Sequence, residues 1–315
     1  MASMVEQAHG PAAQAAADPQ KGFDAGELII SHVANSPIDH PLIHLPPIFG
    51  IDISITKHVF MLWLVAAVLF LVITTLVRRY LKQGRLVPTG LMNALEAIVE
   101  FIRDGVAEPN IGHKWARVWT PLLLTAFLFI LASNVIGLIP IFDALALFNH
   151  YVVHAAPDSF FTKVTHGSAT ATGNYNVTAG LAVVTFFAII VAGTRAHGFV
   201  KHWVNLVPHG MAWPIYILLI PMEIIGMLVR PFALTARLAA NMTGGHIALL
   251  AIMSFVFIFT EMLGSPAAGI SVGLLFSVPL AVAVSGLEII VVLVQAYVFT
   301  LLSAVFIGMA INAHH

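Results

Sequence analysis

Residues 230–246 read RPFALTARLAANMTGGH, and they lie within an apolar run that extends from residue 211 to residue 253. Arg237 is the informative position in this stretch, because a guanidinium stays protonated under any accessible condition. Placing it at membrane depth costs at least about 2.5–3.5 kcal/mol, so a counter-charge must face it. We expect that counter-charge to be an anion that comes and goes. A permanent pairing with Glu223 or with backbone carbonyls is the alternative.

The composition of the whole chain predicts a membrane protein. Of its 315 residues, 59% are hydrophobic and 9% are charged, whereas globular domains carry about 25% charged residues. The net charge of -1 provides no field that would recruit nucleic acid. The absence of cysteine excludes disulfides, thiolate metal sites and cysteine nucleophiles. The N-terminus has no basic start followed by an apolar core, so we expect no cleavable signal peptide.

Five apolar segments are long enough to cross a bilayer. They cover residues 59–77, 118–142, 177–193, 211–253 and 269–312. A helix over residues 211–253 would extend roughly 60 Å at ~1.5 Å per residue, although the hydrocarbon core is only ~30 Å thick. No polar turn divides this run, and the final run poses the same problem. We therefore predict two long, strongly tilted helices packed as a hairpin, with Pro214, Pro221 and Pro231 as candidate bends.

Lysine and arginine are concentrated on one predicted side of the membrane. Segments 78–117 and 194–210 hold nine of them, whereas segments 1–57 and 143–176 hold three. By the positive-inside rule, the first pair of segments is cytoplasmic. The predicted organisation is a polar N-terminal tail outside (1–57), a membrane domain (58–312) with an outer loop (143–176), and a short polar C-terminal end in the cytoplasm (313–315).

An amphipathic segment follows the first span. Between residues 89 and 107, apolar and charged side chains fall on opposite faces of a helix, with Thr89 as the expected N-cap. Such a helix lies on the membrane surface or against a partner and does not cross the bilayer. The predicted fold class is therefore an all-α integral membrane protein, with five membrane-embedded helices and one amphipathic surface helix.

Charged residues of the first long helix form an ordered pattern. Glu223, Arg230 and Arg237 are spaced by seven residues and share one helix face, and Asn241 follows Arg237 at i+4. A polar stripe on an apolar helix indicates a surface that faces water or a polar partner. His246 lies nine residues beyond Arg237, roughly 180° around the helix, so we expect it to face a different environment.

The second long helix carries its own polar pair. Glu288 is the only charged residue between positions 262 and 312, and Gln295 lies seven residues further on the same face. Glu288 and His246 titrate in ranges that protein surroundings move toward neutrality, so both suit proton relay. A lone histidine in an apolar helix is more often a packing residue. The combination of Arg237, His246, Glu288 and Gln295 on adjacent helices favours function.

Other functions find less support in the residues. A transporter or channel would also carry membrane-embedded charges, but it would be expected to show repeats or broken helices. An intramembrane hydrolase lacks a His-Glu-x-x-His or Gly-x-Ser-x-Gly sequence. A metal site is disfavoured because no third ligand stands at sensible spacing; its candidate ligands are His150, His154, His166, Asp143 and Asp158. We therefore expect no catalytic residue, metal or cofactor.

Four motifs resemble those of subunit a of F-type ATP synthases. They are Arg-Leu-x-x-Asn-Met-x-x-Gly at residues 237–245, Glu-Ile-Ile-Val-Val-Leu-Val-Gln-Ala-Tyr-Val-Phe at 288–299, Asn-x-x-Gly-Leu-Ile-Pro at 134–140, and Asn-Tyr-Asn-Val-Thr at 174–178. The resemblance covers about residues 40–312. It implies the same architecture as the hydropathy does: five spans, a surface helix and two long tilted helices.

The resemblance also implies a mechanism, in which the chain is a proton-conducting stator beside a rotating ring of c subunits. Arg237 matches the essential arginine, which attracts the deprotonated ring carboxylate and blocks a direct proton leak between two aqueous half-channels. His246 and Glu288 match the pair that takes up protons from outside, and Glu223 matches a carboxylate on the release side. The polar lining is assigned to Asn134, Asn176 and Gln295, and Asn241 is counted with the proton-translocation residues.

Partners and location follow from the same resemblance. It implies a c-ring, peripheral-stalk b subunits, protons and the lipid bilayer as partners, within a complete ATP synthase of a bacterial inner membrane. This chain departs from many bacterial members in the order of His246 and Glu288, which resembles the mitochondrial arrangement. Gly137 and Asn174 stand where many members carry acids. The 143–176 loop is longer than expected for the family, and the resemblance assigns it no role.

Overall fold

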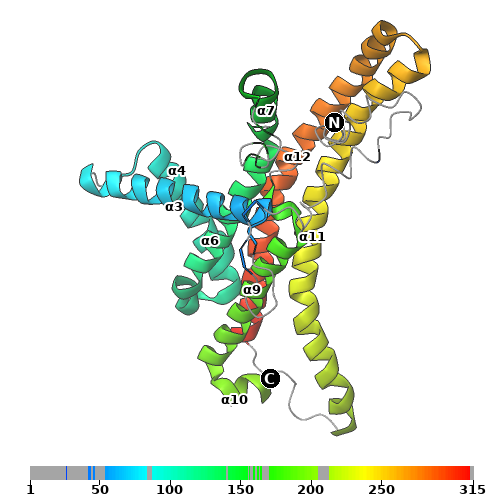
Figure 1. Ribbon diagram of the computed structural model, residues 1–315. Helices are drawn as coiled ribbons and strands as arrows, with labels where there is room; N and C mark the ends of the chain where they lie inside the picture. The colour runs from blue at the N-terminus through cyan, green and yellow to red at the C-terminus, as the bar shows by residue number, and fades with distance from the viewer. Residues whose placement is uncertain are drawn as a thin grey trace. The chain divides into compact units, whose positions relative to one another are not determined.

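The computed structural model describes residues 26, 42–43, 45–46, 54–83, 87–139, 141–154, 156, 159, 162, 164, 170–204 and 213–312. Most of these residues are helical (Figure 1), apart from connecting turns and an isolated antiparallel bridge between Ile43 and Ile55. The chain forms two compact units. The first unit contains residues 1–61, 134–171 and 241–291, and the second contains residues 62–133, 172–240 and 292–315.

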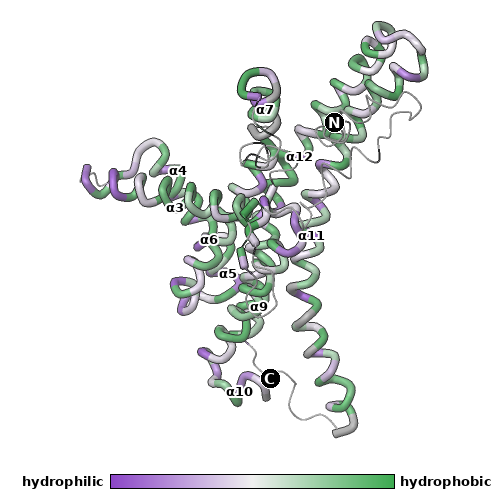
Figure 2. Tube along the Cα trace, viewed as in Figure 1, coloured by the Kyte–Doolittle hydropathy of each residue, from purple (hydrophilic) through white to green (hydrophobic). Residues whose placement is uncertain are grey.

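Five helices are long and apolar enough to cross a membrane, which confirms the predicted number of spans and the all-α membrane class. They are α3 (Lys57–Gln83), α6 (His113–Leu138), α9 (Tyr175–His197), α11 (Trp213–Leu263) and α12 (Pro266–Ile311). Figure 2 shows them as largely apolar helices, with hydrophilic residues at the far end of α3 and in the short helix α10 (Phe199–Val204).

The two predicted long helices are continuous. Helix α11 has 51 residues and α12 has 46, so α11 extends roughly 75 Å at about 1.5 Å per residue. Helical geometry persists through Pro214, Pro221 and Pro231 of α11 and through Pro279 of α12. The described part of the apolar run, residues 213–253, is therefore one helix, as its lack of a polar turn predicts.

The predicted hairpin of α11 and α12 is confirmed within the first unit. Gly264 joins the helices in a left-handed conformation, with φ at 58°, which glycine adopts without steric cost. A Cβ added at Gly269 would lie 2.6 Å from the backbone nitrogen of Thr260, and one added at Gly273 would lie 2.6 Å from the Cα of Val256. The hairpin is therefore packed backbone to backbone through small residues.

The amphipathic segment is helical, but it begins one residue later than predicted. It consists of α4 (Leu91–Glu100), a π-helical stretch η1 (Phe101–Ala107) and α5 (Glu108–Ile111). The expectation that Thr89 caps the helix is wrong. Gly90 is the N-cap, with φ at 63° and no side-chain capping bond. The reversal of the chain needs a positive φ, which a threonine adopts only with strain, so the start of the helix moves to the glycine.

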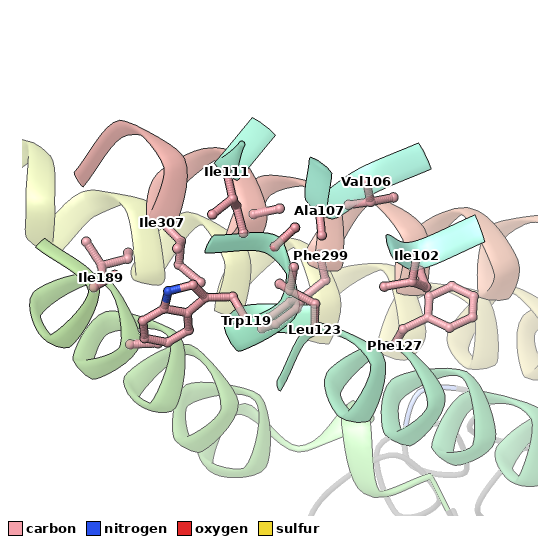
Figure 3. Close-up of a cluster of buried hydrophobic side chains, with 14 of the residues drawn as sticks. Ile102, Val106, Ala107, Ile111, Trp119, Leu123, Phe127, Ile189, Phe299 and Ile307 are labelled. Atoms are coloured by element: carbon pink, nitrogen blue, oxygen red, sulfur yellow. The ribbon is translucent and has the colours of Figure 1, made fainter. Parts of the chain in front are cut away.

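The second unit has a core that buries one face of this amphipathic segment (Figure 3). Ile102, Val106 and Ile111 of the segment are almost completely buried. They belong to one cluster with side chains from α6, α9 and α12, among them Trp119, Leu123, Phe127, Ile189, Phe299 and Ile307. A Cβ added at Gly308 of α12 would overlap the backbone carbonyl of Asn110, so these elements meet at backbone distance. The segment therefore packs along its second half against its own chain.

Part of the predicted outer loop is helical. Helix α7 (Ile141–Phe148) continues into the π-helical turn η2 (Asn149–Val153) and ends at His154, whose φ is 49°. A short 3-10 turn, η3 (Ala171–Gly173), precedes α9. Most candidate metal ligands cannot be compared with the prediction: Asp158, His166 and the side chains of Asp143 and His150 lie outside the described residues, as do most of the N-terminal tail and residues 313–315.

Candidate functional site

Arg237 occupies an exposed position on α11 in the second unit. Its neighbours on the helix, Leu234 and Leu238, are buried in the core of that unit, with exposed fractions of 2% and 0%. These leucines fix the rotation of the helix, so the guanidinium is directed away from the core. Within the part of the chain that the structure describes, no ion pair or hydrogen bond is found for Arg237. An exposed cation on a helix of membrane-spanning length therefore has no counter-charge among the described residues.

Glu223 is paired with Arg230 and not with Arg237, so the alternative in which Glu223 neutralises Arg237 is not observed. Its carboxylate lies 3.5 Å from a guanidinium nitrogen of Arg230, and the Arg230 group stands 5.5 Å from the ring centre of Phe306. The seven-residue spacing thus brings Glu223 and Arg230 together on one face of α11, as the stripe predicts. Both side chains are about one-third exposed, so this pair contributes little to stability where water reaches it.

Glu288 is buried in the first unit against α11. Its exposed fraction is 4%, and a Cβ added at Gly245 would lie 2.6 Å from one of its carboxylate oxygens. Both oxygens are buried without a hydrogen-bond partner among the described residues. Burial of a polar group without a partner is unfavourable, and it is therefore typical of a site that exchanges a proton or meets a mobile ligand. Gly245 thus makes room for a carboxylate that has no hydrogen-bond partner among the residues that the structure describes.

His246, the neighbour of Gly245, is engaged by a residue that sequence analysis did not single out. Its Nε2 lies 2.9 Å from the hydroxyl oxygen of Thr170, in the part of the outer loop that leads into α9. Glu288 accepts no direct hydrogen bond from His246 in this structure. Thr170 carried no sequence signal, because a single threonine in a polar loop is common. Its role becomes visible only in the fold, where it contacts a histidine 76 positions later in the sequence.

A second histidine of the first unit was also missed. His58 is at the first turn of α3 and is buried, with an exposed fraction of 6%, beside the equally buried Lys57. The His58 ring lies beside the backbone of Thr170. A signal existed in this case: a histidine and a lysine stand together where an apolar span begins. Titratable residues at a span boundary would have been worth including among the candidates.

The remaining predicted residues are divided between the two units. In the first unit, Asn134 of α6 is buried and Asn241 of α11 is exposed. In the second unit, Gln295 of α12 is buried, and Asn176 in the first turn of α9 is exposed. The backbone N–H of Asn176 donates to the side chain of Asn174 at 2.8 Å. Asn174 is thus the N-cap of α9, which gives a structural reason for an asparagine at that position.

Comparison with known proteins shows the family of this chain. A family model described as ATP synthase A chain matches residues 59–308. A protein named ATP synthase subunit a 2 from Chlorobium luteolum is 41% identical over 328 residues, covering 100% of this chain and 84% of the relative. ATP synthase subunit a of Chloroherpeton thalassium is 41% identical over 275 residues, covering 86% of this chain and 71% of the relative. The chain, with five helices able to span a membrane, belongs to the ATP synthase A chain family and is a multi-pass membrane subunit for proton transport in ATP synthesis.

Proposed function

We propose that this chain is the stator subunit that couples proton flow to rotation of a c-ring. The observation that carries the proposal is Arg237, an exposed guanidinium on an apolar helix with no ionic partner among the described residues. A fixed cation at membrane depth is unfavourable unless an anion faces it. A carboxylate on a passing ring subunit has the required charge, and it leaves when it takes up a proton.

The chemistry of arginine determines what Arg237 does in this proposal. It attracts a deprotonated carboxylate but does not donate its own proton, since its pKa is too high. A ring site must therefore be protonated before it moves from the arginine into lipid. The same charge repels a proton that would pass directly from one half-channel to the other, so flow is obliged to follow the ring.

Glu288 and His246 are the proposed proton-transfer groups of the uptake half-channel. They lie on facing parts of the α11–α12 hairpin, since the Glu288 carboxylate is held against Gly245 and His246 is the next residue. A carboxyl group and an imidazole both have ordinary pKa values that allow a proton to be taken from water and passed on. Asn134, Asn176, Asn241 and Gln295 are proposed as polar groups along the proton route. Glu223, paired with Arg230, is the proposed release-side carboxylate.

Partners and orientation follow as further parts of the proposal. The c-ring covers the face of α11 that carries Arg237. The α4–η1–α5 segment receives the peripheral-stalk b subunits, because α4 has no buried residue of its own. The subunit resides in a bacterial inner membrane with residues 1–57 outside and the C-terminus in the cytoplasm, because arginine and lysine are concentrated in segments 78–117 and 194–210. It has no catalytic activity by itself.

Replacement of Arg237 tests the proposal. Arg237→Ala is expected to abolish ATP-driven proton pumping and proton-driven ATP synthesis in inverted membrane vesicles, while the subunit still copurifies with the c-ring and b subunits. Arg230→Gln is the matched control, because it removes a guanidinium of the same helix that already has a partner in Glu223. We expect it to lower coupling far less. Normal coupling in assembled Arg237→Ala complexes would refute the assignment.

A further inference from the structure

Thr170 is fully buried, although it belongs to the 143–176 loop, to which the family resemblance assigns no role. Its hydroxyl oxygen lies 2.9 Å from Nε2 of His246 on α11, and its backbone lies beside the ring of His58 on α3. One loop residue thus contacts two histidines that are far apart in the chain. All three residues belong to the first unit.

Gly137 of α6 is what allows the loop to come so close. A Cβ built at Gly137 would overlap the hydroxyl of Thr170 and would lie 2.7 Å from its Cβ. Real side-chain carbons do not approach so closely, and Thr170 has no free space to retreat because it is buried. The missing side chain on α6 and the hydroxyl from the loop are therefore complementary: Thr170 occupies the space that any larger residue at position 137 would fill.

A hydroxyl is well suited to a histidine that changes its protonation state. Neutral imidazole presents one donor and one acceptor, whereas protonated imidazole presents two donors. A threonine or serine hydroxyl can donate to Nε2 or accept from it by rotating one bond. It therefore stays bonded to His246 before and after proton uptake, and the ring need not move. A valine at the same place has the same shape but can do neither.

We propose that Thr170 is a positioning residue of the proton uptake route, which holds the His246 ring in one orientation in both of its protonation states. This inference rests on the proposed function, because it assumes that His246 takes up and releases protons. It assigns a role to the end of the 143–176 loop, which brings one hydroxyl into a membrane-embedded site. The buried ring of His58 lies beside the backbone of the same residue and packs this end of the loop against α3.

The first test compares Thr170→Val with Thr170→Ser. The measurement is passive proton conductance of membranes after removal of the soluble head, normalised to the amount of assembled subunit. Loss of a hydrogen bond to a group that becomes charged is expected to lower conductance by roughly tenfold or more in Thr170→Val. Thr170→Ser retains the hydroxyl and should conduct within about twofold of the wild type. Equal conductance of the valine and serine variants would overturn the proposal.

The second test moves the hydroxyl from the loop to the helix. Gly137→Ser alone should impair conductance, because its Cβ overlaps Thr170. Thr170→Gly alone removes the hydroxyl and should also impair it. Combined, the two substitutions relieve the overlap and place a hydroxyl next to the former position of the Thr170 oxygen. We expect the double variant to conduct several-fold better than either single variant, and conductance no better than the poorer single variant would contradict the inference.

Controls separate this inference from the proposed function. Gly180→Ala introduces a Cβ in another membrane-spanning helix, where nothing lies within 4 Å, and should conduct normally. Glu288→Ala is measured in parallel. If Glu288→Ala conducts like the wild type, the proposed uptake route itself is wrong. If Glu288→Ala is blocked while Thr170→Val conducts normally, the route stands and only the role of Thr170 is rejected. Should Thr170→Val fail to assemble, the comparison of Gly137→Ser, Thr170→Gly and their double variant decides the question.

Discussion

Gly245 of α11 faces the carboxylate of Glu288 of α12, and the two residues are so close that a methyl group at position 245 would lie 2.6 Å from a carboxylate oxygen. The glycine therefore determines how near the acid comes to the helix that carries His246. Because the crowded atom is the end of a side chain, a larger residue would displace Glu288 without requiring the backbone to move. The geometry of the acid can thus be changed without removing the acid.

Substitution of this glycine should alter conductance more than stability. Gly245→Ala is expected to rotate the Glu288 carboxylate away from α11 and to reduce passive proton conductance several-fold. The accompanying overpacking costs about 1–3 kcal/mol at most. Gly244→Ala is the matched control, since a Cβ there has no atom within 4 Å. Conductance through head-depleted membranes checks both variants, and equal values for the two would show that the position of the carboxylate is unimportant.

Exchange of the two titratable residues tests whether they act as a pair. Glu288→Ala and His246→Ala should each slow proton uptake strongly, because a transferred proton needs an acceptor within hydrogen-bond reach, directly or through one water. His246→Glu combined with Glu288→His restores one acid and one imidazole. The double exchange should therefore recover more passive conductance than either single exchange. If it conducts no better than the poorer single exchange, the residues do not form one titrating unit.

The hairpin should be sensitive to side chains on its inner face. Gly269→Ala would place a carbon 2.6 Å from the backbone nitrogen of Thr260, and a backbone atom cannot yield without separating the helices. We expect a lower midpoint of thermal aggregation for the detergent-purified complex, in line with an overpacking cost of about 1–3 kcal/mol. Gly286→Ala, on the same helix but with no atom near the added carbon, should retain the wild-type midpoint. A wild-type midpoint in Gly269→Ala would exclude close packing of the hairpin.

The buried ring of His202 in α10 should make the stability of the second unit sensitive to acid. Burial lowers the pKa of His202 from its ordinary value of 6.5, and the neighbouring charge of His197 lowers it further. The folded protein thus favours the neutral ring, so the stabilisation is complete above about pH 6.5 and is lost as pH falls below it toward the folded-state pKa. Thermal aggregation midpoints at pH 8 and pH 5.5 should therefore differ less in His202→Gln than in the wild type. Equal pH dependence would show that His202 does not contribute.

Helices and their order were predictable from hydrophobic length, because a continuous apolar run of membrane-spanning length has few alternatives. The polar stripe was predictable from helical periodicity, because residues seven apart share one face of a helix. Glu223 and Arg230 pair across this spacing. Apart from the α11–α12 hairpin, contacts between elements were not predictable. Nothing in the sequence near Thr170 indicates His246, and the space at Gly137 exists only once α6 and the loop are packed together. The start of the surface segment was misplaced, because a positive φ at Gly90 overrides the capping preference of Thr89.

The meeting of Gly308 with the carbonyl of Asn110 has a consequence for biosynthesis. The core of the second unit combines residues 102–130 with residues 296–311, so its earlier part leaves the ribosome long before its later part exists. Until the final helix is inserted, the apolar face of the amphipathic segment lacks the α12 side chains that complete this core. Completion of the core therefore serves as a check that translation reached the end of the chain. A subunit truncated before residue 296 would keep its first spans yet leave part of this face exposed.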